Sequence, residues 1–216
     1  MQGTQQLIDQ IHDAFRETDH PGDAHLVGSQ LGCEPEETIG PFKGVRHWTE
    51  VDPAILDPHY TALGFFTEGG FRQFLPAFLV ADVRGQLQTA DPVFDLTHGF
   101  AEGKTIEVPA GGRIHRRSNG KSVLVSPRLY GAMTWHDYAV RRLAVFTREE
   151  AAAIVAYLLW RRDQDTDGLF QADIDAALES FWRERVRSAP TQAQLRQHIQ
   201  AEADYMNDLR NDLKKG

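Results

Sequence analysis

The sequence has little cysteine, no long apolar run and fewer basic than acidic residues. Its one cysteine, Cys33, excludes an internal disulfide, which is typical of a protein of the reducing cytoplasm. The longest uninterrupted apolar run, Ala151 to Trp160, is far shorter than the ~20 residues that span a bilayer. The first residues contain no basic segment leading into an apolar stretch. We therefore expect a cytoplasmic protein that neither enters nor binds a membrane.

The charge balance narrows the class of partner. The chain has 23 Lys and Arg residues against 31 Asp and Glu residues, a net charge of -8. Such a chain repels polyanions unless its positive charge is gathered locally, so we expect no tight binding of nucleic acid. A length of 216 residues suits one domain with its own core, and we expect a single domain over 1–216.

Helical spacing of apolar residues predicts a mainly α fold. A first amphipathic helix is indicated by the spacing of Leu7, Ile8, Ile11, Ala14 and Phe15. From Pro21 to Pro58 the frequent prolines and glycines predict irregular chain held to the core by its aromatic residues.

Three further helices are expected in the second half of the chain. Thr147 and Glu150 form a capping-box pattern before a helix that reaches about Arg162. A second apolar stripe over 170–182 predicts its partner in a helical hairpin. Thr191 caps a last helix over 191–213, which we expect to dock along the domain.

The most regular pattern predicts a central helix. One broad apolar stripe is formed by Phe71, Phe74, Leu75, Phe78 and Leu79. Thr67 is a suitable N-cap, and Gly85 is suited to the position after the last turn. Pro76 lies inside this helix, where proline costs about 3 kcal/mol in regular geometry, so we expect a kink or a late start.

This block resembles the mark of an uncharacterised bacterial domain family, the sequence Gly-Phe-Arg-x-Phe-Leu-Pro-Ala-Phe-Leu over 70–79. The resemblance extends to Pro21-Gly22-Asp23, to the segment from Phe42 to Trp48, to the helix after Phe146 and to Ala177–Trp182. It implies a fold class and a bacterial origin. Since the family has no known activity, it implies no reaction.

Asp82 is the first candidate for a catalytic residue. It projects close to the apolar stripe of the central helix, in the last turn, where the helix dipole disfavours a carboxylate. One interpretation is that the stripe has reached the edge of the core and that Asp82 is solvated. The other is a buried carboxylate paired with an arginine or histidine from another segment, which would mark an enzyme site.

A β-hairpin insertion is expected near 104–134. Short β-favouring runs begin at Thr105, Arg113 and Ser122, and Asn119-Gly120 suits a tight turn. From Pro109 to His136 the chain has no acidic residue but five cations, namely Arg113, Arg116, Arg117, Lys121 and Arg128. They either keep an exposed hairpin soluble or bind a phosphate, a nucleic-acid backbone or an acidic partner protein. Of the partners, we expect an acidic protein.

The segment 163–168 resembles the first half of an EF-hand calcium loop. Asp163, Asp165 and Asp167 alternate before Gly168, but Ile174 stands where the bidentate glutamate belongs. The segment is therefore either a solvated connection or a weak calcium site, and we expect no other cofactor. Altogether the sequence predicts a mainly α (α+β) single domain, more suited to a non-catalytic interaction or accessory protein than to an enzyme. Its oligomeric state is open.

Overall fold

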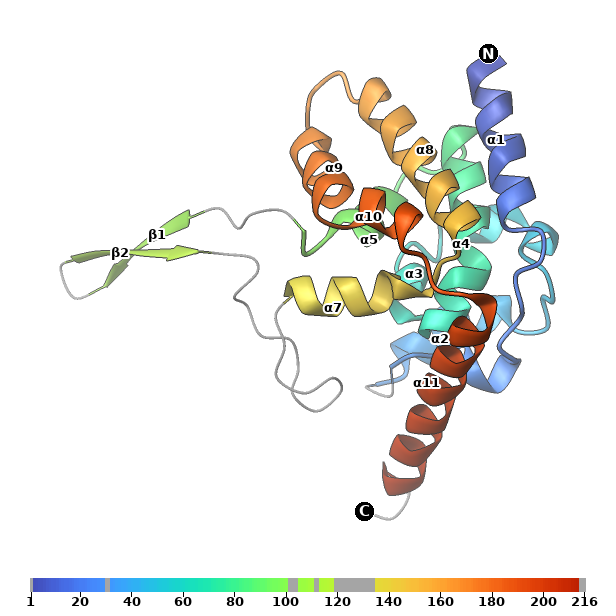
Figure 1. The fold of residues 1–216 in the computed structure, drawn as a ribbon. Coiled ribbons are helices and arrows are strands. Elements are labelled where there is room, and N and C mark those ends of the chain that lie inside the picture. The colour runs from blue at the N-terminus through green and yellow to red at the C-terminus, as the bar shows by residue number, and fades with distance from the viewer. Residues whose placement is uncertain (1, 30–31, 101–104, 111–112, 119–134, 214–216) are drawn as a thin grey trace.

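The computed structural model describes residues 2–29, 32–100, 105–110, 113–118 and 135–213. Within them the chain is mainly helical, as Figure 1 shows, so the predicted multi-helix fold is confirmed. The helices are α1 (Gln2–Ala14), α2 (Glu34–Ile39), α3 (Ala62–Phe65), α4 (Glu68–Val83), α5 (Pro92–Thr97), α7 (Trp135–Arg142), α8 (Arg148–Gln164), α9 (Gln171–Ala177), α10 (Arg183–Arg187) and α11 (Gln192–Leu213). Among the described helices, none is both long and apolar enough to span a membrane.

Short turns complete the helical body. Turns of 3₁₀ helix occupy Asp23–His25, Gly40–Phe42, Trp48–Glu50, Pro53–Ile55 and Leu143–Val145, and a π-helical turn, Leu178–Trp182, joins α9 to α10. The segment after Pro21 is held to the core as expected, because the side chains of Phe42 and Trp48 are buried. The indole N–H of Trp48 donates to the Phe15 carbonyl at 2.9 Å.

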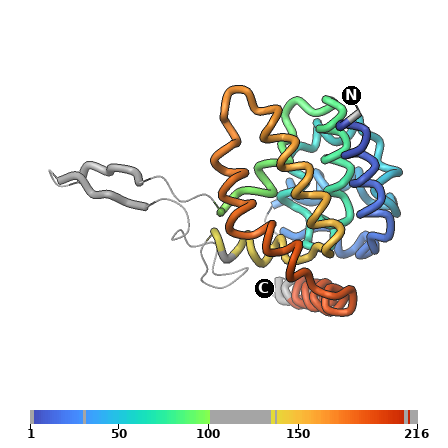
Figure 2. The backbone as a smooth tube through the Cα atoms, turned by 45° about the horizontal axis from the view of Figure 1, so that its top comes forward, coloured from blue at the N-terminus to red at the C-terminus, as the bar shows by residue number. Residues whose placement is uncertain are grey.

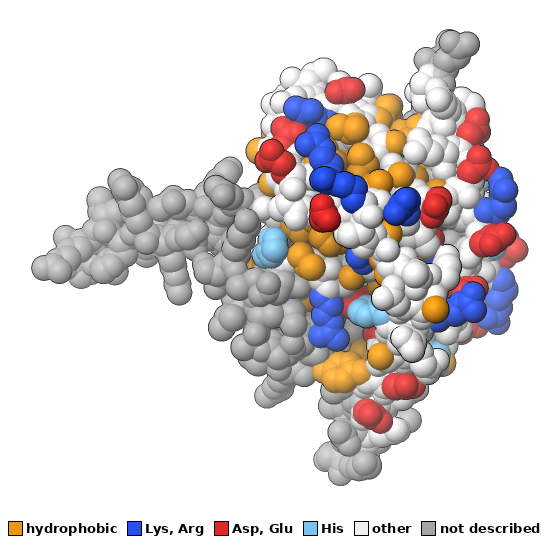
Figure 3. Space-filling view, viewed as in Figure 1, with side chains coloured by type: hydrophobic (Ala, Val, Ile, Leu, Met, Phe, Trp, Pro, Cys, Tyr) orange, Lys and Arg blue, Asp and Glu red, His pale blue; other side chains and the backbone are white. Residues whose placement is uncertain are grey.

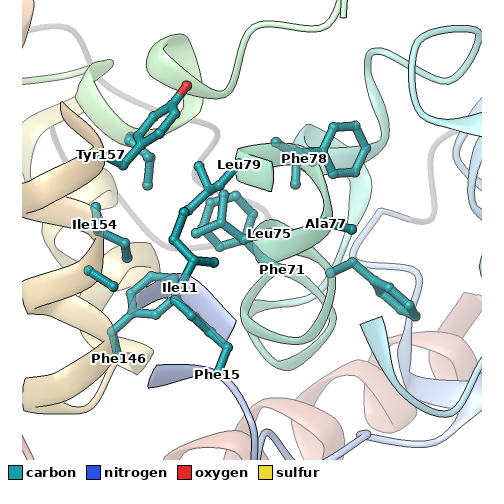
Figure 4. Packing of buried hydrophobic residues seen from close by; sticks show 14 of the residues in the cluster. Ile11, Phe15, Phe71, Leu75, Ala77, Phe78, Leu79, Phe146, Ile154 and Tyr157 are labelled. Atoms are coloured by element: carbon teal, nitrogen blue, oxygen red, sulfur yellow. The ribbon is translucent and has the colours of Figure 1, made fainter. Parts of the chain in front are cut away.

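Helix α4 lies inside the domain. Helices α1 and α8 pack beside it and against each other (Figure 2). In the core, Ile11 of α1 and Ile154 of α8 approach Leu79 of α4, as Figure 4 shows. We expected one apolar stripe, but the side chains of α4 are buried on every side from Glu68 to Ala81. A helix surrounded by other elements has no solvent face, so its buried polar residues need partners within the protein.

The start of α4 is fixed by its cap. The Thr67 hydroxyl accepts from the Gly70 N–H at 3.1 Å, and the helix runs from Glu68 through Pro76 to Val83. Of the two alternatives, the late start is therefore wrong, and a kink at Pro76 stays a prediction. Gly85 follows the helix with a φ of 68°, the left-handed conformation that suits glycine after a last turn.

Helix α11 contacts the start of α4. The Glu202 carboxylate accepts from the N–H groups of Glu68 at 2.7 Å and Gly69 at 3.3 Å, while His198 bonds to the Glu68 carboxylate. These contacts satisfy two backbone donors that α4 cannot pair within itself.

Strands β1 (Thr105–Ala110) and β2 (Arg113–Ser118) pair in antiparallel register. Their side chains, the predicted turn at Asn119-Gly120 and residues 119–134 lie outside the described part of the chain. The hairpin insertion over 104–134 thus stays a prediction.

Candidate binding groove on helix α5

Helix α5 presents one face to the core and another to the surface. Asp91 caps it, with a carboxylate oxygen accepting from the Val93 N–H at 3.0 Å, and Pro92 occupies the first turn, where its missing N–H costs nothing. The inward face consists of Val93, Leu96 and Thr97, all buried. The opposite face carries Asp91, Phe94, Asp95 and His98, which follow the i, i+3, i+4, i+7 spacing of one helical face.

Two adjoining cavities lie over this outward face, and we call them together the α5 groove. The larger, about 480 Å³, extends from Phe94 to Tyr60, and the smaller, about 210 Å³, extends from Phe94 to Trp135 of α7. Gly64 and Asp95 line both. A Cβ atom at Gly64 would meet no atom within 4 Å, so its missing side chain leaves space in the groove.

Exposed aromatic rings line the α5 groove. The side chains of Phe94 and Tyr60 are 57% and 52% exposed. The Phe94 ring stacks on His98 with centroids 4.7 Å apart, and His98 meets Trp135 edge to face at 5.1 Å. The aromatic row thus continues from α5 to α7. Large apolar side chains gathered in a hollow are typical of surfaces that bind a partner or ligand.

Asp95 is the carboxylate that the two cavities share. Burial raises its pKa to about 7, the nearby Asp91 carboxylate adds to that rise, and the Arg142 guanidinium opposes it. Within the described residues, no donor hydrogen-bonds to the Asp95 carboxylate. Arg142 itself donates to the Leu63 carbonyl and lies 4.7 Å over the Phe71 ring, so its charge is shared with other groups.

Two further groups on the outward face of α5, Asp91 and His98, also have pKa values shifted by burial. Burial raises the pKa of Asp91, and its cap bond to Val93 and the charge of Arg161 only partly oppose that effect. Partial burial among the rings lowers the pKa of His98, which favours the neutral imidazole at pH 7. The groove therefore holds two desolvated carboxylates that lack a full countercharge in the described structure.

The structure gives Asp82 partners from another segment. The Tyr157 hydroxyl donates to Asp82 at 2.6 Å, and the Arg161 guanidinium lies 3.5 Å away, both from α8. The Asp82 side chain is 16% exposed. Burial, reinforced by Asp82, raises the pKa of Tyr157 well above its usual value, so this hydroxyl stays a donor. Asp82 is therefore a partnered carboxylate beside the groove, and its charge adds to the rise in the pKa of Asp91.

The three aspartates of the predicted calcium loop are not brought together. Asp165 is buried, and its carboxylate accepts from the N–H groups of Leu169 at 3.1 Å and Phe170 at 2.7 Å. Asp163 and Asp167 are exposed. No group of three or more His, Cys, Asp or Glu side chains in the described residues can hold a metal ion. Asp165 stabilises the turn before α9 through these two bonds.

The predicted basic surface falls largely outside the described side chains. The backbone of β2 includes Arg113, Arg116 and Arg117, whereas Lys121 and Arg128 lie in the segment that the structure does not describe. On the face shown in Figure 3, Lys and Arg side chains are interspersed with Asp and Glu side chains.

The groove is not among the sites predicted from the sequence, although part of its signal is present in the chain. An Asp-Pro pair starting a short helix, followed by an outward face of acids and aromatics, is visible at Asp91–His98. Nothing in the sequence brings Tyr60, Gly64 and Trp135 to that face, because only tertiary packing places α3 and α7 beside α5.

Comparison with protein-family models, curated proteins and solved structures finds no match to this chain. The resemblance of the 70–79 block to a bacterial family therefore stays a prediction. The chemistry of the groove has to be inferred from its residues: aromatic faces suited to a flat or apolar group, and carboxylates suited to a cation.

Proposed function

We propose that this chain is a non-catalytic interaction protein that docks a partner protein on the α5 groove. The observation that carries the proposal is Phe94, a large apolar side chain that is more than half exposed beside a cavity of about 480 Å³. Burying such a ring against a partner gains on the order of 1.5–3 kcal/mol. A single exposed ring is ordinary on a protein surface. Here Tyr60, His98 and Trp135 add further rings beside Phe94, so the groove offers a continuous aromatic surface.

The fold supports a preformed site. Phe94 and Asp95 stand on a helix whose first turn is fixed by Asp91 and whose other face is buried. A site on a capped and packed helix loses little conformational entropy when a partner binds. We further propose that the protein acts in the bacterial cytoplasm and that the basic residues from Arg113 to Arg128 form a separate surface for an acidic protein.

Captured partners test the groove. Wild type, Phe94→Ala and Gly64→Phe are compared as bait in a lysate of the source organism, with Leu169→Ala as the matched control. Leu169 is 72% exposed and lies in the turn before α9, outside the groove. We expect both groove variants to lose the same captured proteins, because one removes the exposed ring and the other fills the cavity, while Leu169→Ala keeps them. Capture that is identical in all four proteins excludes the groove as the docking surface.

A second candidate function is proton transfer by Asp95. A carboxyl group with a pKa of about 7 in a cavity is suited to general acid or base catalysis at neutral pH. If a substrate turnover is found, this candidate requires Asp95→Asn to abolish it while Phe94→Ala mainly raises KM. An activity that survives Asp95→Asn would place the chemistry elsewhere.

A further inference from the structure

We propose that the α5 groove receives the guanidinium of an arginine that a partner protein presents from an apolar segment. This inference rests on the proposed function and names the chemistry of the partner. It commits to arginine because the groove joins aromatic faces to carboxylates, and a planar guanidinium can stack on a ring while it donates to carboxylate oxygens.

Within the described residues, the carboxylates of the groove have no cation to themselves, although Arg142 lines the smaller cavity. Asp95 and Asp91 are both desolvated. The Asp91 carboxylate adds to the rise in the pKa of Asp95, and the Asp82 carboxylate adds to that of Asp91. Arg142 lowers the pKa of Asp95, and Arg161 lowers that of Asp91. Arg142 also donates to the Leu63 carbonyl, and Arg161 lies beside the Asp82 carboxylate. An incoming cation would therefore meet carboxylates that gain from its charge, and binding would favour their ionised forms.

The aromatic rings favour a flat cation over a compact one. This chain itself places guanidinium groups over rings, with Arg142 4.7 Å from the centroid of Phe71 and Arg161 5.2 Å from that of Phe170. The exposed rings of Phe94 and Tyr60 offer the same kind of face, and among the described residues no guanidinium lies over either ring. Because the rings of Phe94 and Tyr60 are apolar, we expect the residues that flank the partner's arginine to be apolar too.

Charge supports the direction of the pairing. The chain has a net charge of -8, so the molecule as a whole attracts a basic partner more than an acidic one. Phosphate and carboxylate ligands are disfavoured at the groove itself, because Asp91 and Asp95 would face them. A cavity of about 480 Å³ is large enough for a side chain rather than for a folded element.

A peptide titration tests this inference. The probe is acetyl-Ala-Leu-Arg-Leu-Ala-amide, and its matched control carries citrulline, which keeps the shape of arginine without its charge. Binding to the full chain is followed by calorimetry at pH 6 and pH 8. We expect the arginine peptide to bind about tenfold more tightly than the citrulline peptide, the size of one charge-assisted hydrogen bond. We also expect its affinity to rise with pH, because Asp95 must be ionised to pair.

The groups that set this pH dependence are Asp91, Asp82, Arg142, Arg161 and His98 beside Asp95. His98 is expected to contribute little, since its pKa is lowered. In Asp95→Asn the preference for arginine over citrulline should fall severalfold and the pH dependence should shrink. Asp163→Asn, which removes an exposed charge outside the groove, should leave both unchanged.

The outcomes separate the inference from the function on which it rests. Equal binding of the two peptides, or a preference for arginine that survives Asp95→Asn, overturns the arginine assignment. If the lysate proteins still depend on Phe94 and Gly64, the docking function stands with another occupant, such as a neutral apolar segment. If neither the peptide nor any captured protein depends on the groove, both proposals fail.

Discussion

Two desolvated carboxylates of this domain, Glu150 and Asp95, differ in whether the protein gives them hydrogen-bond donors and a countercharge. Glu150, at the start of α8, accepts from Arg72 through both oxygens at 2.9–3.1 Å and from the Thr147 N–H at 2.7 Å. Asp95 faces the α5 groove, where no described donor hydrogen-bonds to its side chain. One charge is balanced inside the chain and serves the fold. The other has no hydrogen-bond donor within the described residues, and we propose that a partner supplies one.

Glu202 of α11 is an intermediate case. Its carboxylate accepts from the Glu68 and Gly69 N–H groups, yet burial and the neighbouring Glu68 carboxylate raise its pKa to about 7. Hydrogen bonds favour the charged form there, but they do not replace a cation. These three acids show that hydrogen bonds and countercharge are separate requirements for a buried carboxylate.

The largest expected effect is the loss of the Glu150–Arg72 pair. Glu150→Ala leaves the buried Arg72 guanidinium without a countercharge and removes the capping box of α8, so the free energy of unfolding should fall by about 3–5 kcal/mol. Urea unfolding measures the loss. The double variant Arg72→Met/Glu150→Met should be more stable than Glu150→Ala, because no buried charge remains. A loss below about 1 kcal/mol for Glu150→Ala would contradict the assigned role of this pair.

Asp95 should show the opposite behaviour. Its folded pKa of about 7 lies above the usual value of 3.8, so folding is penalised as pH rises through that interval and the penalty is complete above about pH 7. Asp95→Asn removes the penalty. The variant should therefore gain stability over wild type between pH 5 and pH 8, by less than about 1.4 kcal/mol per pH unit, since Asp95 keeps some contact with water. A difference that does not vary with pH would mean that Asp95 is already compensated.

The sequence predicts the scaffold better than the groove. The caps at Thr67, Thr147 and Thr191 depend on residues a few positions apart, and the structure bears them out. The Arg72–Glu150 pair joins residues 78 positions apart. Glu150 belongs to the predicted capping box, but nothing local in the sequence indicates that it meets Arg72. The same limit hides the groove, whose walls come from α3, α5 and α7.

A smaller effect is expected at the contact between α11 and α4. Since the folded pKa of Glu202 is raised to about 7, its contribution to docking falls as pH rises from about 4.5 through 7. Glu202→Gln keeps an acceptor for the Glu68 and Gly69 N–H groups without the charge beside Glu68. Hydrogen exchange of those two amides, corrected for intrinsic rates, measures their protection factors. Between pH 6 and pH 8 the protection factors should fall in wild type by about fivefold more than in Glu202→Gln.

Some pH dependence should survive in Glu202→Gln. The hydrogen bond to Glu68 raises the pKa of His198, so its stabilising charge is lost as pH rises through that raised value. His198→Gln in the same background should remove most of this remainder. Equal loss of protection in wild type and Glu202→Gln would show that Glu202 does not control the contact.

The smallest expected effect is that of calcium on the 163–168 segment. A ligand that binds only the folded state must stabilise it, so a bound cation would raise the melting temperature. Asp165 already uses both carboxylate oxygens for the Leu169 and Phe170 N–H groups, and coordinating a cation would compete with those bonds. We therefore expect no shift at millimolar calcium, whereas Asp165→Ala should lower stability by about 1–3 kcal/mol with or without calcium, because it leaves backbone donors unpaired. A calcium-dependent rise that Asp165→Ala abolishes would instead show that the loop rearranges to bind the cation.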